Sequence, residues 1–158
     1  MKPNIIFYFS DQQRYDTLTK ELMPNVWQLG LEGVRFDNSY TCQPVCGPAR
    51  ACLQSGIYAT ENGCFRNGIS LSREHKTLAD YFNESGYDTA YIGKWHLASD
   101  TASFNCEKTA VPKERQGGYK YWRAADVLEF TSDSCGGYVF DEKGNKITFD
   151  GYRSDCIN

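Results

Sequence analysis

Strand-like and helix-like segments alternate from the start of the chain to residue 96. The run at 4–9, Asn-Ile-Ile-Phe-Tyr-Phe, is continuously apolar and aromatic, which is typical of a strand covered on both faces in a parallel sheet. Segments 34–40 and 88–96 have the character of two further strands, and helical segments lie between the three. This order predicts an α/β layered fold with a mostly parallel central sheet.

Local signals place the helices. Pro24 suits a first helical turn, and we expect Gly33 to end that helix in a left-handed conformation. Another helix is expected to begin around Pro48, because proline is tolerated where its missing N–H has no partner to lose. Thr77–Asp80 has the form of a capping box, which predicts a helix that ends at Gly86.

Beyond residue 96 the periodicity is weak. Segment 99–119 is expected to be a long loop, a kind of segment that is often functional when it lies over a compact domain. Segments 138–141 and 146–149 have strand character and are joined across 142–145, so they predict a hairpin.

Composition restricts the partners that the chain can take. Its 158 residues, 41% hydrophobic, suffice for one domain or part of a larger one. Seventeen Lys and Arg against twenty Asp and Glu, without a like-charge block, argue against nucleic acid. No apolar run of about 18 residues could span a bilayer, and the first residues lack a signal-peptide layout. We therefore expect a cytoplasmic protein with neither nucleic acid nor membrane as a partner.

The cysteines argue against a disulfide framework. Their number, seven, is odd, and a chain of this size does not need disulfide bonds to be stable. Most of them are expected to be reduced thiols. A module that binds metal through Cys42, Cys46, Cys52 and Cys64 is an alternative, although their spacing lacks the paired pattern of structural zinc sites.

Asp11 and Gln12 follow the first predicted strand. The carboxyl ends of strands are where open α/β sheets gather their ligands. Carboxylate and amide oxygens suit Ca²⁺ or Mg²⁺ better than softer metals. From the residues alone, a turn or helix-capping role for Asp11 stays open.

Cys46 lies where a helix is expected to begin, in the segment Cys-Gly-Pro-Ala-Arg-Ala-Cys-Leu-Gln-Ser-Gly at 46–56. Unpaired N–H groups and the helix dipole favour anions at such a position. Arg50, one turn further on, can hold an anionic oxygen with charge-assisted hydrogen bonds. The alternative is a pair of buried thiols, Cys46 and Cys52, with Arg50 as a surface cation.

A third candidate lies at the end of the strand at 88–96. Because side chains alternate along a strand, Lys94 and His96 are expected on one face and Trp95 on the other. A cation beside an imidazole would make an anion clamp with a proton donor for a departing alkoxide. Polar residues are also common at strand ends without such a role.

Segment 46–56 resembles the signature of the type I sulfatases, C-x-P-x-R followed five residues later by Thr-Gly, here Ser55-Gly56. Gly-Lys-Trp-His at 93–96 has the form that the substrate-binding Lys and His of that family take in many members. The resemblance runs along nearly the whole chain in the order of the family, and it includes Pro24-Asn25, Glu32–Phe36, Leu78–Phe82, Gly86-Tyr87 and Gly151–Asp155.

The resemblance implies an alkaline-phosphatase-like fold and a sulfuric ester hydrolase. In this family a maturing enzyme oxidises the signature cysteine to formylglycine, so Cys46 would be the precursor of the nucleophile. One hydroxyl of the hydrated aldehyde attacks sulfur, and the second then expels sulfate. Arg50, Lys94 and His96 would surround the sulfate group of a sulfated small molecule or sulfated carbohydrate.

The resemblance also implies a divalent cation, Ca²⁺ or Mg²⁺, held by Asp11, Gln12 and Cys46. Gln12 replaces an acidic residue found in many sulfatases, which removes one negative charge. The remaining metal ligands of the family lie beyond residue 158. We therefore expect 1–158 to be the amino-terminal part of a single catalytic domain, with an incomplete fold and no activity alone. A phosphonate monoester or phosphodiester hydrolase, and a non-catalytic binding member, are the alternatives.

Overall fold

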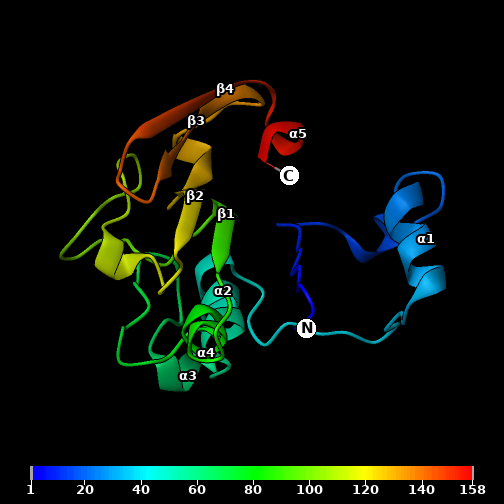
Figure 1. Cartoon of the computed structure of the whole chain (residues 1–158), viewed down its shortest axis with the longest axis horizontal. Coiled ribbons are helices and arrows are strands. Elements are labelled where there is room, and N and C mark those ends of the chain that lie inside the picture. The colour runs from blue at the N-terminus through cyan, green and yellow to red at the C-terminus, as the bar shows by residue number, and fades with distance from the viewer. Residues whose placement is uncertain (1, 158) are drawn as a thin grey trace. The chain divides into compact units, whose positions relative to one another are not determined.

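The computed structural model describes residues 2–157 and divides into two compact units, one ending at Tyr40 and one starting at Thr41 (Figure 1). The first unit holds a 3₁₀ turn, η1 (Tyr15–Thr17), and the helix α1 (Pro24–Glu32). The helix begins at Pro24 as predicted. Gly33 follows it with φ −117° and donates its N–H to the Leu29 carbonyl at 2.9 Å, so the left-handed ending predicted for Gly33 is wrong.

The strands predicted at 4–9 and 34–40 are absent from the described part of the first unit. Ile6 is 92% exposed and Val34 is 78% exposed, whereas a central strand would bury such side chains. The physical reason is pairing, because a strand needs a neighbour for its backbone N–H and C=O groups, and residues 2–40 show no strand pairing. Apolar sequence alone therefore gave the wrong prediction there.

The second unit begins with helices. α2 (Cys46–Ser55) ends at Gly56, whose φ of 69° is the left-handed conformation that glycine adopts at low cost. α3 is Ala59–Asn62, and α4 is Leu78–Glu84. The Thr77 hydroxyl accepts from the Asp80 N–H while the Asp80 carboxylate accepts from the Thr77 N–H. The predicted capping box is confirmed.

A mixed sheet follows in the order β1-β2-β3-β4. Its strands are β1 (Ala90–Lys94), β2 (Tyr121–Ala125), β3 (Cys135–Asp141) and β4 (Lys146–Tyr152). The α/β class and the predicted hairpin, β3–β4, are confirmed. Only β1 and β2 are parallel among the described strands, so the sheet is not mostly parallel. A parallel pair needs a long crossover, which 95–120 supplies, whereas the shorter later connections return antiparallel.

Aromatic rings fill the core beside the end of β1. The rings of Tyr91 and Trp122 stack with centroids 5.3 Å apart, and Trp95 packs edge-on against Tyr91 at 4.9 Å. Trp95 is 2% exposed, as expected for the face opposite Lys94. This packing fixes the backbone where β1 ends, and that is where the candidate site lies.

The segment between β1 and β2 is a long loop, as predicted. It contains the 3₁₀ turn η2 (Lys113–Arg115) and an isolated bridge between Asp100 and Phe104. A further 3₁₀ turn, η3 (Leu128–Phe130), connects β2 to β3, and a short helix, α5 (Arg153–Ile157), follows β4. Within residues 2–157, no helix combines the length and the apolar character that crossing a membrane requires.

Candidate active site

The amino-terminal end of α2 is held close to the segment that follows β1. Cys46 is the first helical residue and is half-buried, with Val45 extended before it. The Gly47 N–H donates to the Asn67 side-chain oxygen at 2.8 Å. A Cβ added to Gly47 would lie 3.5 Å from the His96 carbonyl oxygen. The signature helix therefore meets the Gly-Lys-Trp-His segment at the position of the cysteine.

Arg50 joins these two segments directly. It is 7% exposed, so the surface alternative weighed for it is wrong. Its guanidinium donates to the Tyr91 hydroxyl at 3.2 Å and to the Lys94 carbonyl. The Tyr91 hydroxyl also donates to that carbonyl, at 2.6 Å. Arg50 thus carries a positive charge into the site and also fixes the end of β1.

Lys94 ends β1 with its ammonium group paired to a carboxylate. Its Nζ lies 2.7 Å from Oε1 of Glu129, and its side chain is only 9% exposed, against 46% for Glu129. Glu129 belongs to η3 and was missed by the sequence analysis. Because β1 and β2 are parallel, with Lys94 opposite Ala125, their carboxyl ends open at the same edge, where α/β sheets place ligands.

The backbone turns sharply at His96, just after Lys94 and the end of β1. The strand ends at Lys94, and His96 has φ 57°, an uncommon conformation for a residue with a side chain. The predicted strand alternation therefore does not extend to His96. Strained residues persist where the surrounding structure holds them, and they cluster at functional sites.

The electrostatics at His96 favour a neutral ring. Burial, and then the positive charge of Lys94, lower the pKa of His96 below its ordinary value, assisted by Arg50 and opposed by the carboxylates of Asp126 and Glu129. Its Nδ1 is buried without a hydrogen-bond partner among the described residues. An anion bound beside Lys94 would stabilise the protonated ring and raise the pKa of His96 again.

Asp126 is a second residue that the sequence analysis missed. It follows β2, is fully buried, and its carboxylate accepts the N–H groups of Leu97, Ala98 and Ser99 at 3.0, 3.0 and 2.9 Å. Like Asp11 after the predicted strand at 4–9, it is an aspartate placed just after a strand-like segment. Asp126 therefore holds the loop that begins at His96.

Asp11 and Gln12 lie in the first unit, whereas the residues above lie in the second. Gln12 has φ 57°, and both residues are exposed. Within residues 2–157, no group of three or more His, Cys, Asp or Glu side chains is arranged to hold a metal ion. The metal-ligand role of Asp11, Gln12 and Cys46 stays a prediction, and the four-cysteine alternative gains no support.

Comparison with known proteins identifies the family. The family model described as Sulfatase matches residues 3–145. The chain is 39% identical over 130 residues to an ulvan-active sulfatase of Formosa agariphila, covering 79% of this chain and 24% of the relative. It is 32% identical over 161 residues to an N-acetylglucosamine-6-O-sulfatase of Bacteroides thetaiotaomicron, covering 99% of this chain and 26% of the relative.

A solved structure gives the same assignment. The structure of BT4656 in complex with its substrate D-glucosamine-2-N,6-O-disulfate matches with a TM-score of 0.66 and 29% identity, covering 85% of this chain and 24% of that one. The chain spans about a fifth to a quarter of the length of the curated relatives it matches. The signature at 46–56, the cluster around Lys94 and these matches agree, and the chain belongs to the sulfatase family.

Proposed function

We propose that the full-length protein hydrolyses sulfate esters of sugars, with Cys46 as the precursor of the nucleophile. One observation carries the proposal: the start of α2 and the Lys94–His96 segment meet, with Arg50 bonded across them. Positive charge and a helix amino terminus in one place suit a tetrahedral anion. The sugar is suggested by two relatives, one named an ulvan-active sulfatase and the other an N-acetylglucosamine-6-O-sulfatase.

The environment of Cys46 is compatible with formylglycine. Formylglycine, when formed by a maturing enzyme, supplies a hydrated aldehyde whose hydroxyl is the nucleophile. Cys46 is half-buried at the first helical position, and Asn67 fixes the following N–H, so the reacting atom would be held in a set direction. The buried Arg50 would raise the local positive potential that favours a bound sulfate.

Lys94 and His96 would act on the sulfate and on the departing sugar oxygen. Lys94 would bind a sulfate oxygen. Its ammonium group would then either contact Glu129 and the sulfate together or give up its ion pair with Glu129. With its lowered pKa, His96 would take up a proton as the anion binds, and it could then deliver that proton to the leaving alkoxide.

The proposal of a divalent cation rests only on the type of ligand atom that Asp11 and Gln12 carry. Asp11 and Gln12 carry hard oxygens suited to Ca²⁺ or Mg²⁺, but a Ca²⁺ ion takes about six to eight oxygens. Asp11 and Gln12 would therefore supply only part of such a site, and we assign no step of the reaction to the ion. The ion would neutralise negative charge on the bound ester.

The test is hydrolysis by the full-length protein co-expressed with a formylglycine-maturing enzyme. We expect kcat/KM for N-acetylglucosamine 6-sulfate to exceed that for N-acetylglucosamine 6-phosphate by at least about 100-fold, close to 3 kcal/mol of transition-state discrimination. Lys94→Ala should lower turnover of the sulfate, whereas Lys120→Ala, a lysine paired to the exposed Asp88, should not. Faster cleavage of the phosphate would overturn the proposed reaction.

A further inference from the structure

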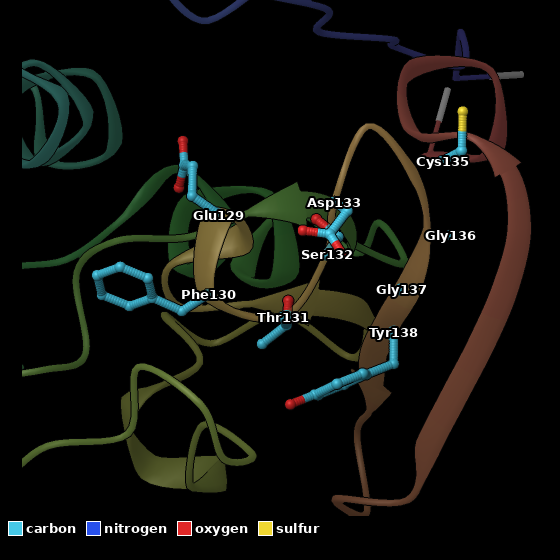
Figure 2. Close-up of a pocket in the computed structure, with 9 residues that line it drawn as sticks. All are labelled: Glu129, Phe130, Thr131, Ser132, Asp133, Cys135, Gly136, Gly137 and Tyr138. Atoms are coloured by element: carbon cyan, nitrogen blue, oxygen red, sulfur yellow. The ribbon is translucent and has the colours of Figure 1, made fainter.

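A cavity of about 450 Å³ lies next to the ion pair of Lys94 and Glu129 (Figure 2). The reaction proposed above assigns no role to it. It is lined by η3 and by the start of β3, between Glu129 and Tyr138. Its volume is in the range of small-molecule sites. We propose that it holds the sugar ring that carries the sulfate, an inference that rests on the proposed function.

Glu129 belongs to both sites. The residue lines the cavity, and its carboxylate lies 2.7 Å from the Lys94 ammonium group. It is about half exposed, whereas the Lys94 side chain is nearly buried, so Glu129 marks the boundary between them. A ligand with its sulfate on Lys94 and His96 would thus extend past Glu129 into the cavity.

The lining has the chemistry that a sugar requires. Exposed carboxylates at Glu129 and Asp133 can accept charge-assisted hydrogen bonds from hydroxyl groups. Phe130 is 50% exposed and offers an apolar face for the C–H groups of a ring. In Figure 2, the Phe130 ring and the hydroxyl end of Tyr138 are directed to the same side, with Asp133 near the centre.

Charged groups of both signs lie around the cavity, which suits a neutral ring with several hydroxyl groups. Lys94 pairs with Glu129, the Arg153 Nη1 lies 3.4 Å from the Ser132 Oγ, and the Lys146 Nζ lies 3.5 Å from the centre of the Tyr138 ring. The lining itself contributes two carboxylates, those of Glu129 and Asp133. A neutral, hydroxyl-bearing ring can accept from the cations and donate to the carboxylates.

The backbone around the cavity is fixed by hydrogen bonds and a bulge. The Tyr138 N–H donates to the Thr131 carbonyl at 3.0 Å, and the Asp133 N–H donates to the Gly136 carbonyl at 3.2 Å. Gly137, with φ 149°, lies so close to Ser132 that an added Cβ would be 2.4 Å from the Ser132 Cβ. Irregular pairing at this point of β3 is the kind of bulge that often re-aims side chains beside active sites.

The experiment compares two esters on the matured full-length protein: N-acetylglucosamine 6-sulfate, with a hydroxylated ring, and 4-nitrophenyl sulfate, without one. In Asp133→Asn and in Phe130→Ala, the ratio of kcat/KM for the sugar ester to that for the aryl ester should fall at least about 10-fold, the loss of one good hydrogen bond or ring contact. Asp88→Asn is the matched control, because its 95% exposed carboxylate precedes the opposite end of β1. An unchanged ratio in both cavity variants would overturn the inference.

A binding measurement separates this inference from the proposed reaction. Calorimetry on the Cys46→Ala full-length protein measures affinity for the same two esters without turnover. The sugar ester should bind at least about 10-fold more weakly to Cys46→Ala/Asp133→Asn, and the aryl ester should change less. Equal changes for the two esters would reject the cavity as a sugar site. If the matured wild type cleaves neither ester, the proposed reaction fails, and the cavity is still judged by this binding.

Discussion

The backbone N–H of His96 donates to the carbonyl oxygen of Asp126 at 2.7 Å, which joins the residues that follow the two parallel strands. The Asp126 carboxylate then accepts the next three N–H groups along the loop, those of Leu97, Ala98 and Ser99. The positive φ of His96 thus lies between a backbone bond to Asp126, which directly follows the neighbouring strand, and three bonds to the carboxylate of the same residue. Asp126 is a positioning residue for the site.

Asp126→Ala should lower the free energy of unfolding by about 3–5 kcal/mol, because it leaves three buried N–H groups without an acceptor. Asp126→Asn keeps the shape and one acceptor oxygen, so its loss should be smaller. Urea unfolding of the full-length variants measures both, with the exposed Asp150→Asn as a control. A loss below about 0.5 kcal/mol in Asp126→Ala, the range of ordinary surface changes, would show that the loop is held in another way.

Arg50 should be needed for stability as well as for charge. Arg50→Ala removes a buried donor to Lys94 and Tyr91, and it is expected to cost about 2–3 kcal/mol. Tyr91→Phe removes only one partner and should cost about 1 kcal/mol. Denaturant titration compares the two variants, and equal losses would contradict the role assigned to the guanidinium.

The pKa of His96 should lie below its ordinary value without sulfate and should rise when sulfate binds. Burial and Lys94 disfavour the protonated ring in the folded state. The contribution of neutral His96 to folding stability is therefore complete above the ordinary histidine pKa of about 6.5. It is lost as pH falls towards the lowered pKa of the folded state. Titration of ¹⁵N-labelled histidine by NMR, with His96→Gln to assign the signal, measures this. A pKa at or above the ordinary value without sulfate would contradict the account.

The metal prediction concerns Asp11. In the full-length protein, Asp11→Asn should weaken Ca²⁺ binding by about 10-fold or more, the effect expected for a lost charged ligand. Asp16→Asn, which removes a carboxylate paired to Arg14 in the same unit, should change it less than about 2-fold. The 158-residue chain alone should show no stoichiometric site in a calcium titration, and finding a tight one would contradict the view that its ligands are too few.

Features encoded in neighbouring residues were predictable from the sequence. The helix at α4 follows from Thr77 and Asp80, which cap each other three residues apart. The hairpin of β3 and β4 follows from two short strand-like segments with a tight connection. Pro24 marked the start of α1 for the same local reason.

Features that depend on distant partners were not predictable. The apolar run at 4–9 has the composition of a strand, but strand formation depends on a pairing neighbour that composition does not reveal. Glu129 and Asp126 enter the site only because β1 and β2 are parallel and end together at Lys94 and Ala125. The prediction that Lys94 and Trp95 lie on opposite faces was correct. The turn at His96 was not predictable, because it is held by a bond to Asp126, which follows β2.

The central claim is that Cys46 becomes the nucleophile of a sulfate ester hydrolase. The most direct measurement is a peptide mass map across Cys46 of the full-length protein, coupled to turnover of N-acetylglucosamine 6-sulfate by the wild type and by Cys46→Ala. The account predicts a mass loss of about 18 Da at Cys46, as for conversion of a thiol-bearing side chain to an aldehyde, with turnover that disappears in Cys46→Ala. Turnover by Cys46→Ala at the rate of the wild type would contradict it.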